Sequence, residues 1–537
     1  MAQFHIPREE KDADGELNYK DVEAGDVVYL QTGSRNRLLI RNFHGTKENP
    51  IIFRPSDWAS DVIISSEENY GISIRNCSHI SITGWQGANG LYGIKIEKVE
   101  GSGSVGVSTS NKSTNVELSF IEIGNVGFAG ILSKTEPDCN DPSTFRGAFV
   151  QKDTRIHHCY IHDTGSEGLY IGSTQFLGQE LGDCGKQYPH LLDGVRIHHN
   201  RVERTGWDGI QVSSALTDCK IYDNVLVDCS ISEKEAQMSG IIIGGGTTAD
   251  CYNNTIIDCR ATAILVFGNA GTKVFNNLII RPALQFEPGN PDEREYGIYI
   301  NDKTYVDDSF YGIYSNTIIQ PKSDGIRISS SFSFETRMYN NLIVDPGAWD
   351  VYENDNTDFT GNDSFVFLEN SEQNVRMAAN VFVRSSSLPK FMDAEDDNYR
   401  LMYDSQYVDA GRDLTDQIGV NFDIENKRRP IHDGWDVGAY EYGDVSASNL
   451  VSGSMEPVKI RAIESSDHDK ELIITVFEPG FMKWTLLTIT GQITSKSENK
   501  WYEQGEYHFS LKNHSSGIRI LHVEGAGWKI AEKVLIN

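Results

Sequence analysis

The chain has no run of 18 apolar residues, so no segment is long enough to form a transmembrane helix. It also lacks a Cys-x-x-Cys pair, and its 8 cysteines do not follow the spacing of a zinc site. The start, Met1-Ala2-Gln3, is polar and has no apolar signal-peptide core. Two interpretations stay open from this segment: a cytosolic protein, or an exported protein whose signal peptide is missing from this sequence.

Basic residues are scarce as well. The 48 Lys and Arg residues stand against 77 Asp and Glu residues, which gives a formal net charge of −29. We expect no nucleic-acid partner, because nucleic-acid binding depends on neutralising phosphates, and no attraction to anionic membrane surfaces. The acidic excess fits an extracellular protein that tolerates Ca²⁺, and it fits simple solubility equally well.

A repeat runs through residues 70–385, which explains how 537 residues are organised without one oversized core. Each unit has a short alternating strand, an Asn, a second strand and then Gly-Ile-x-Ile, and period-2 alternation predicts strands. Spacings of 23 to 39 residues separate the aligned asparagines Asn200, Asn224, Asn254, Asn277, Asn316, Asn341 and Asn380. Each unit buries Ile and Val only by stacking on its neighbours, and stacked Asn side chains satisfy buried polar groups.

This pattern resembles the right-handed parallel β-helix repeat family, which is pectate-lyase-like, over roughly residues 20–440. The resemblance implies an all-β fold and leaves the chemistry open, since the family includes lyases, hydrolases, epimerases and adhesins. We therefore predict a right-handed parallel β-helix over residues 1–442, with a closing cap at about 399–442. A Ser-, Gly- and Asn-rich linker at 443–457 and a small C-terminal β-sandwich at 458–537 follow.

The last 80 residues alternate as short strands, for example Leu472–Phe477 and Trp484–Ile489. They resemble the type IX secretion C-terminal sorting domain of Bacteroidetes-type bacteria. The resemblance implies recognition by the outer-membrane secretion machinery and an extracellular or cell-surface location. A carbohydrate-binding or immunoglobulin-like sandwich is the alternative. We expect a monomer, because a capped solenoid has no exposed end to pair.

The cysteines fit this repeat. Cys219 and Cys251 share one inward strand position, and we expect stacked core thiols there. Cys139 and Cys184 lie in polar insertions of neighbouring coils. A disulfide between them and two free thiols both remain open.

Two rows of outward side chains are candidate binding surfaces. The first row lies just before the Asn turn and consists of His157, His198, Tyr222, Tyr252, Phe275, Tyr314 and Tyr339, with Arg155, Arg196, Lys220, Lys273 and Arg337 beside it. Its rings stack on sugar faces, or stack on one another across the strands, or lie beneath a covering loop. The second row follows the Gly-Ile turns and consists of Lys95, Leu132, Tyr170, Gln211, Ile242, Leu265, Tyr299 and Arg327. The insertions 133–153, 173–194 and 284–296 border the second row, whose apolar middle predicts a covering loop.

The candidate catalytic residues are Lys134, Arg146, Asp163, Glu167 and Asp208. Glu167 and Asp208 precede Gly168 and Gly209 in successive repeats, so they should stack within roughly 5 Å. They would suit retaining glycoside hydrolysis as acid and nucleophile. As Ca²⁺ ligands they would suit a uronate lyase, in which a Lys, Arg, His or Tyr takes the C5 proton. They would also suit a purely structural role that closes turns.

Two functions follow. The first is a secreted polysaccharide lyase or glycoside hydrolase, with Tyr170, His157, His198, Arg155, Arg196 and Tyr222 binding substrate. The second is a non-catalytic carbohydrate-binding surface protein or adhesin. A groove lined by Lys134, Glu167, Tyr170 and Asp208 favours the enzyme, whereas a flat exposed aromatic face with that cluster buried in turns favours the binding protein.

Overall fold

The chain divides into two compact units, Met1–Asp444 and Val445–Asn537, in a computed structural model. The structure describes all residues except 1–3, 58–59, 88–89, 287–293, 303–308, 330–334, 348–364, 370–372, 420, 444–457, 465–469, 477–479, 489–492, 497–499, 503–504, 511–516, 526–527 and 537. Most of the expected linker at 443–457 and part of the 284–296 insertion lie outside the described residues.

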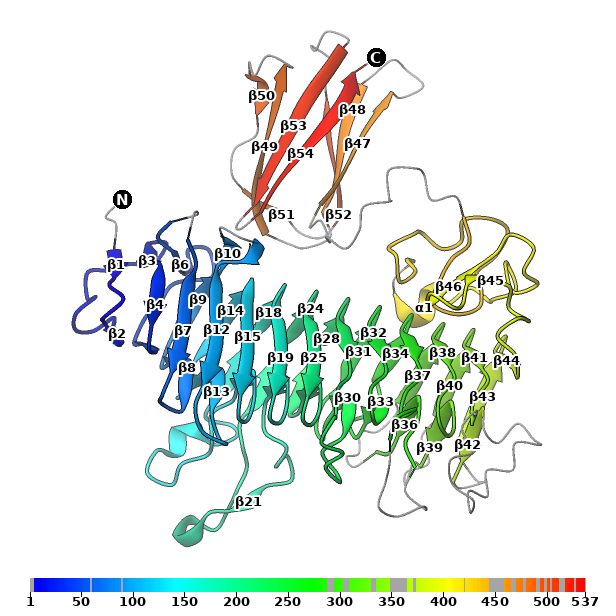
Figure 1. Cartoon of the computed structure of the whole chain (residues 1–537), viewed down its shortest axis with the longest axis horizontal. Helices are drawn as coiled ribbons and strands as arrows, with labels where there is room; N and C mark the ends of the chain where they lie inside the picture. The colour runs from blue at the N-terminus through cyan, green and yellow to red at the C-terminus, as the bar shows by residue number, and fades with distance from the viewer. Residues whose placement is uncertain are drawn as a thin grey trace. The chain divides into compact units, whose positions relative to one another are not determined.

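The first unit is a parallel β-helix, as the sequence predicts, and its coils stack along one axis (Figure 1). Sheet A contains β1 (Phe4–Ile6), β3 (Val27–Leu30), β6 (Ile51–Pro55), β9 (Ser78–Thr83), β14 (Thr114–Ser119), β18 (Arg155–His157), β24 (Arg196–His198), β28 (Cys219–Tyr222), β31 (Ala249–Tyr252), β34 (Lys273–Phe275), β37 (Phe310–Tyr314), β40 (Glu335–Tyr339) and β43 (Asn374–Ala378). Sheet B contains β4 (Gly33–Arg35), β7 (Val62–Ser66), β12 (Ile94–Val99), β15 (Ile121–Val126), β19 (Tyr160–Thr164), β25 (Arg201–Thr205), β29 (Val225–Val227), β32 (Thr255–Ile257), β35 (Leu278–Ile280), β38 (Thr317–Ile319), β41 (Leu342–Val344) and β44 (Val381–Val383). Sheet C contains β2 (Asp12–Asp14), β5 (Leu38–Arg41), β8 (Tyr70–Arg75), β13 (Val105–Ser110), β16 (Ile131–Ser133), β20 (Leu169–Ile171), β26 (Ile210–Val212), β30 (Ser239–Ile243), β33 (Thr262–Val266), β36 (Ile298–Ile300), β39 (Ile326–Ile328) and β42 (Val366–Leu368).

The turn from sheet A to sheet B explains the recurrent asparagine. One residue in the left-handed region, such as Asp223 at φ 53°, turns the chain, and the following Asn points inward. Asn224 Nδ2 donates to Asn254 Oδ1 at 2.9 Å, and Asn254 Nδ2 donates to Asn277 Oδ1 at 3.0 Å. This ladder continues to Asn380 and confirms the expected stacking of amides, which pairs polar groups that would otherwise be buried unsatisfied.

The turn from sheet C back to sheet A carries the long insertions. The strands β17 (Val150–Lys152), β23 (Leu191–Asp193) and β27 (Ala215–Thr217) form a short parallel sheet there. The insertions also contain the 3-10 helices Pro142–Thr144 and Gly182–Cys184 and the antiparallel pair β21 (Gln179–Glu180) and β22 (Lys186–Gln187). They project from one side of the solenoid (Figure 1). A second antiparallel pair, β10 (Trp85–Gly87) and β11 (Gly90–Tyr92), extends an earlier turn between sheets A and B.

The closing segment packs along the side of the solenoid. It contains β45 (Phe391–Asp393), β46 (Asn398–Leu401) and α1 (Thr415–Ile418). Leu414, Ile418 and Trp435 pack on the rings of sheet A, and Phe391, Tyr399, Leu401 and Val437 pack on the outer face of sheet B. The segment therefore buries the outer faces of several late coils, whereas a simple cap would cover only the open end of the last coil.

The second unit is a small antiparallel β-sandwich. One sheet contains β47 (Val458–Glu464), β48 (Lys470–Val476) and β52 (Gly505–Ser510). The other contains β49 (Gly480–Thr488), β50 (Ile493–Lys496), β51 (Lys500–Tyr502), β53 (Gly517–Gly525) and β54 (Trp528–Ile536). Within the described parts of the chain, we find no helix of the length and apolar character that a membrane crossing needs.

Candidate active site

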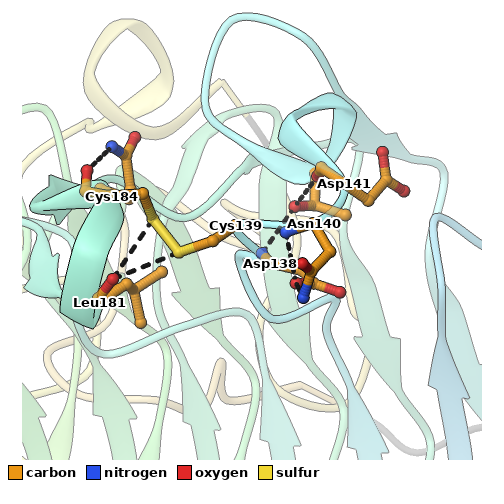
Figure 2. The surroundings of a disulfide bond; sticks show 8 residues. Asp138, Cys139, Asn140, Asp141, Leu181 and Cys184 are labelled. Carbon is orange, nitrogen blue, oxygen red and sulfur yellow. Dashed lines mark hydrogen bonds between the residues drawn. A yellow bond between two sulfur atoms is a disulfide. The ribbon is translucent and has the colours of Figure 1, made fainter.

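Two neighbouring insertions are tied together beside sheet C. Cys139 and Cys184 form a disulfide, so one of the two alternatives left open by the sequence holds (Figure 2). Asp138 and Asn140 flank Cys139 in a tight turn, in which Asn140 N donates to Asp138 Oδ1 at 2.8 Å (Figure 2). The insertions thus form a braced wall along one edge of the sheet.

Arg146 is part of this brace. Its Nη2 donates to the carbonyl oxygen of Phe176 at 2.7 Å, and its Nε donates to that of Pro189 at 3.2 Å. The guanidinium also lies 4.3 Å from the centre of the Phe176 ring. These contacts hold the first insertion against the second, so the geometry gives this candidate catalyst a positioning role.

Reduction of the disulfide should loosen the wall without unfolding the solenoid. A crosslink of this kind is worth about 2–4 kcal/mol to the segment that it closes. We expect faster hydrogen exchange of residues 175–188 in a Cys139→Ser/Cys184→Ser variant, measured by mass spectrometry. Exchange in the Asn-ladder coils should be unchanged, and a global rise in exchange would contradict this local role.

Lys134 and Tyr170 meet on the outer face of sheet C, next to the wall. Leu132 and Tyr170 are neighbours in the register of β16 and β20. The Lys134 ammonium lies 4.2 Å from the centre of the Tyr170 ring and pairs with Glu136 Oε1 at 2.5 Å. The Tyr170 hydroxyl lies 3.1 Å from Thr174 Oγ1 of the second insertion. Although burial opposes the charged form, Tyr170 and Glu136 raise the pKa of Lys134 above its usual value, so the ammonium stays protonated.

Glu167 and Asp208 are brought together as predicted, but they lie in the protein interior. Their relative exposures are 1% and 0%, and Glu167 Oε2 and both Asp208 carboxyl oxygens have no hydrogen-bond partner in the described part of the chain. Burial raises the pKa of Glu167 to about 7. Burial and the neighbouring Glu167 raise the pKa of Asp208 well above its usual value. A polysaccharide therefore cannot reach this carboxyl pair in the structure.

These raised pKa values predict a pH dependence of stability. Between the unfolded pKa near 4 and the folded value of about 7 for Glu167, the folded state holds protons that the unfolded state has released. The stability contributed by the pair is therefore present at low pH and is lost as pH rises through this window. We expect urea unfolding of Asp208→Asn to show a smaller decline between pH 4 and pH 7 than the wild type. An identical decline in both proteins would refute the assignment.

The second outward row forms on sheet C with one correction. Leu132, Tyr170, Gln211, Ile242, Leu265, Tyr299 and Arg327 are successive neighbours. Lys95 is not among them, because β12 belongs to sheet B, where Lys95 pairs with Glu122. Ser108 occupies the position next to Leu132. The sequence Gly93-Ile94-Lys95-Ile96 imitates the Gly-Ile turn, yet it follows the β10–β11 hairpin and enters sheet B.

The ring row on sheet A forms a stacked column. His157, His198, Tyr222, Tyr252 and Phe275 have successive ring centroids 4.9, 4.7, 5.0 and 4.8 Å apart, with interplanar angles of 4° to 13°. Because the rings face one another along the solenoid axis, their edges point outward and their faces are not available to sugars. Phe275, Tyr314 and Tyr339 are also buried by the closing segment. The geometry matches cross-strand stacking for the rings from His157 to Phe275 and coverage by the closing segment for the rings from Phe275 onward.

The edges of this column remain polar. His157 Nε2 lies 3.0 Å from Glu117 Oε1, and the Nδ1 atoms of His198 and His199 are 2.9 Å apart. Beside the column, Arg155, Arg196 and Lys220 are neighbours in register, and Arg196 pairs with Asp218 at 2.5 Å. This face offers hydrogen-bonding groups and cations, on a different sheet from Lys134 and Tyr170.

Asp163 lies apart from both faces, at the end of β19. Arg204 donates to both of its carboxyl oxygens, at 2.7 and 2.9 Å, and His162 Nδ1 lies 2.7 Å from Oδ2. Arg204 and His162 lower the pKa of Asp163 to about 2. Arg204 was not predicted from the sequence. The available sequence signal was that Arg204 precedes Thr205-Gly206 just as Asp163 precedes Thr164-Gly165 in the previous repeat.

Glu167 and Asp208 do not provide the donor set that the expected Ca²⁺ site requires. Calcium binds 6 to 8 oxygen ligands, whereas Glu167 and Asp208 are two buried carboxyls with raised pKa values. Among the residues that the structure describes, no group of three or more His, Cys, Asp or Glu side chains could hold a metal ion. We therefore derive no step through a metal.

Comparison with known proteins supports the fold. The family model for the right-handed β-helix region matches residues 191–364, about a third of the chain. No curated protein matches the sequence. The handedness of that family agrees with the right-handed solenoid expected from the repeat.

Several solved structures are distantly similar. An alginate lyase from Paenibacillus sp. str. FPU-7 is 16% identical over 61% of this chain and 97% of its own, with a TM-score of 0.41. A double mutant of the periplasmic alginate epimerase AlgG is 13% identical over 71% of this chain and 85% of its own, with a TM-score of 0.36. A mannuronic acid specific polysaccharide family 6 lyase from human gut microbiota is 12% identical over 70% of this chain and 83% of its own, with a TM-score of 0.28. Likenesses this distant do not assign a ligand or a reaction to this chain.

Proposed function

We propose that this protein is a polysaccharide lyase that cleaves a uronate-containing polysaccharide by β-elimination on the outer face of sheet C. The observation that carries the proposal is the Lys134–Tyr170 pair, in which a protonated ammonium lies 4.2 Å from the phenol ring centre beside the braced wall. A cation and a proton-transfer group at this separation are the two functions that elimination next to a carboxylate needs.

The proposed chemistry assigns one role to each group. The Lys134 ammonium binds the uronate carboxylate and stabilises the negative charge that develops on it when the C5 proton leaves. Tyr170 reacts as the phenolate: its oxygen takes the C5 proton, the C4–C5 double bond forms, and the C4–O bond breaks. The phenol formed in this way gives the same proton to the departing O4, so Tyr170 returns to the phenolate.

The buried carboxyls are compatible with an anionic substrate. Ionised Glu167 and Asp208 would repel a uronate bound at Lys134, and burial reduces this repulsion because it raises the pKa of both carboxyls. Their burial also does not support a retaining hydrolase, whose two carboxyl groups must flank the bond that is cleaved.

A substrate panel tests the proposed reaction. We expect the full chain to release unsaturated products, detected by ultraviolet absorbance, from at least one uronate-containing polysaccharide, with chelator present as well as with Ca²⁺. Reducing ends without absorbance would indicate a hydrolase and overturn the proposal. If no polysaccharide of the panel is cleaved but binding is retained, the alternative function is favoured. That function is a carbohydrate-binding surface protein that uses the Arg155–Arg196–Lys220 row of sheet A.

We further propose that residues 458–537 direct export through the type IX secretion machinery. The antiparallel sandwich of this unit supports the resemblance of its sequence to such sorting domains. Fusion of residues 458–537 to a signal-peptide-bearing periplasmic reporter should place the reporter outside the cell in a bacterium with this pathway. Retention in the periplasm would contradict this role.

A further inference from the structure

A groove of about 570 Å³ runs along the turn from sheet B to sheet C, away from the face that carries Lys134 and Tyr170. It crosses successive coils, touching Val99, Val126, Thr164, Arg204 and Ile231 in turn. With coils about 4.8 Å apart, four intervals give it a length of roughly 19 Å. Its volume lies within the range of about 300–1,000 Å³ that is typical of ligand sites, but the groove is shallow and open to solvent.

The floor of the groove is bare backbone. A Cβ atom on Gly127 would lie 2.0 Å from the carbonyl oxygen of Gly101, and one on Gly165 would lie 2.3 Å from that of Gly127. No side chain fits at these two positions, because each turn packs directly on the one before it. The strip of glycines follows from this packing and does not by itself make a site; the groups along its edge supply the binding chemistry.

The charged side chains that line the groove are one acid and one base. Asp163 and Arg204 are both lining residues and pair through two hydrogen bonds, yet their side chains remain 41% and 40% exposed. Arg204 has five N–H groups, of which two bind Asp163 and one binds Glu203 at 2.7 Å. The exposed Asp163–Arg204 pair can therefore still donate hydrogen bonds to a ligand and accept them from it.

The other edge is apolar. Ile231 is 41% exposed, and its backbone is fixed to the previous coil by a bond from its N–H to the carbonyl oxygen of Thr205 at 3.0 Å. A sugar ring presents hydroxyls at its rim and C–H groups on its face. An ion pair that both donates and accepts suits vicinal hydroxyls, while Ile231 suits the C–H face. The net charge of the lining residues is zero, which gives an anionic chain no advantage.

We propose that this groove is a second carbohydrate-binding site, which holds a segment of a linear neutral polysaccharide against the Asp163–Arg204 pair. It is independent of the proposed elimination, because it uses different residues, a different face of the solenoid and an uncharged ligand. The length of the groove favours a chain of several sugars over a single ring.

Affinity electrophoresis of the full chain through gels containing xylan, galactomannan, xyloglucan or laminarin tests this site. We expect retardation by at least one of these neutral polysaccharides that persists at 0.5 M NaCl. Arg204→Met should weaken the apparent affinity about tenfold or more, because charged hydrogen bonds to the ligand are lost. Arg201→Met is the matched control, since Arg201 belongs to the same ion-pair network but does not line the groove.

A blocking variant covers the outcome in which Arg204→Met disturbs the local fold. Ser102 lines the groove without contacting the ion pair, so Ser102→Trp should fill the groove and abolish retardation. Retardation by none of the four polysaccharides, or retardation unchanged in both variants, would overturn the proposal. Loss of retardation in Ser102→Trp with normal release of unsaturated products would separate this site from the elimination site.

Discussion

Replacing Tyr170 by Phe should lower kcat on a uronate polysaccharide by about 10³, with KM nearly unchanged. The substitution removes the oxygen that moves the proton and keeps the ring beneath Lys134, and a positioned proton-transfer group is worth about 10²–10⁴ in rate. Because the substrate carboxylate still meets the ammonium, ground-state binding is preserved. Initial rates of unsaturated-product release, measured over a range of substrate concentrations, separate kcat from KM.

Two further variants make this result specific. Lys134→Met should raise KM as well as lower kcat, because the cation holds the carboxylate both before and during the reaction. Tyr188→Phe removes a hydroxyl from an exposed ring of the adjacent insertion and should leave both constants unchanged. A Tyr170→Phe protein with wild-type kcat would remove Tyr170 from the chemistry.

Replacing Asn254 by Ala should destabilise the β-helix by about 3–5 kcal/mol. Asn254 Nδ2 donates to Ile221 O and to Asn277 Oδ1, and Asn254 Oδ1 accepts from the N–H and Nδ2 of Asn224. All these groups are buried, so truncation leaves several of them unpaired at about 1–3 kcal/mol each, partly offset by relaxation. The shift in the urea unfolding midpoint of the β-helix measures the loss.

Asn374 provides the matched control for the ladder. It lies on the exposed side of β43, so Asn374→Ala should change the unfolding free energy by less than about 0.5 kcal/mol. Equal effects of the two substitutions would show that the buried amide ladder contributes nothing particular to stability.

The repeat made the fold predictable, because its consequences are local. An Asn at one inward position of every unit has few ways to satisfy its amide, so the ladder followed from the spacing of Asn224 and Asn254 alone. The stacking of Glu167 on Asp208 was predictable for the same reason. Their burial was not, because the repeat spacing places both residues at the same turn position without showing whether the side chains face solvent or the interior.

The other differences between the sequence predictions and the structure concern the orientation of side chains and the segments that cover them. The position of His198 and Tyr222 on the outer face was predicted, but the sequence does not show that the rings lie face to face. Nor does it show that α1 and Trp435 cover Phe275. Arg146 is of a residue type that can act in catalysis, and only its contacts with Phe176 and Pro189 show that it holds the two insertions together.

A crystal structure of Tyr170→Phe with a bound uronate oligosaccharide would show on which sheet the substrate binds. We expect a uronate carboxylate oxygen about 2.7–2.9 Å from Lys134 Nζ, with C5 of that sugar facing the edge of the substituted ring, where the hydroxyl stood. An oligosaccharide bound along Arg155, Arg196 and Lys220 of sheet A, with sheet C empty, would contradict it.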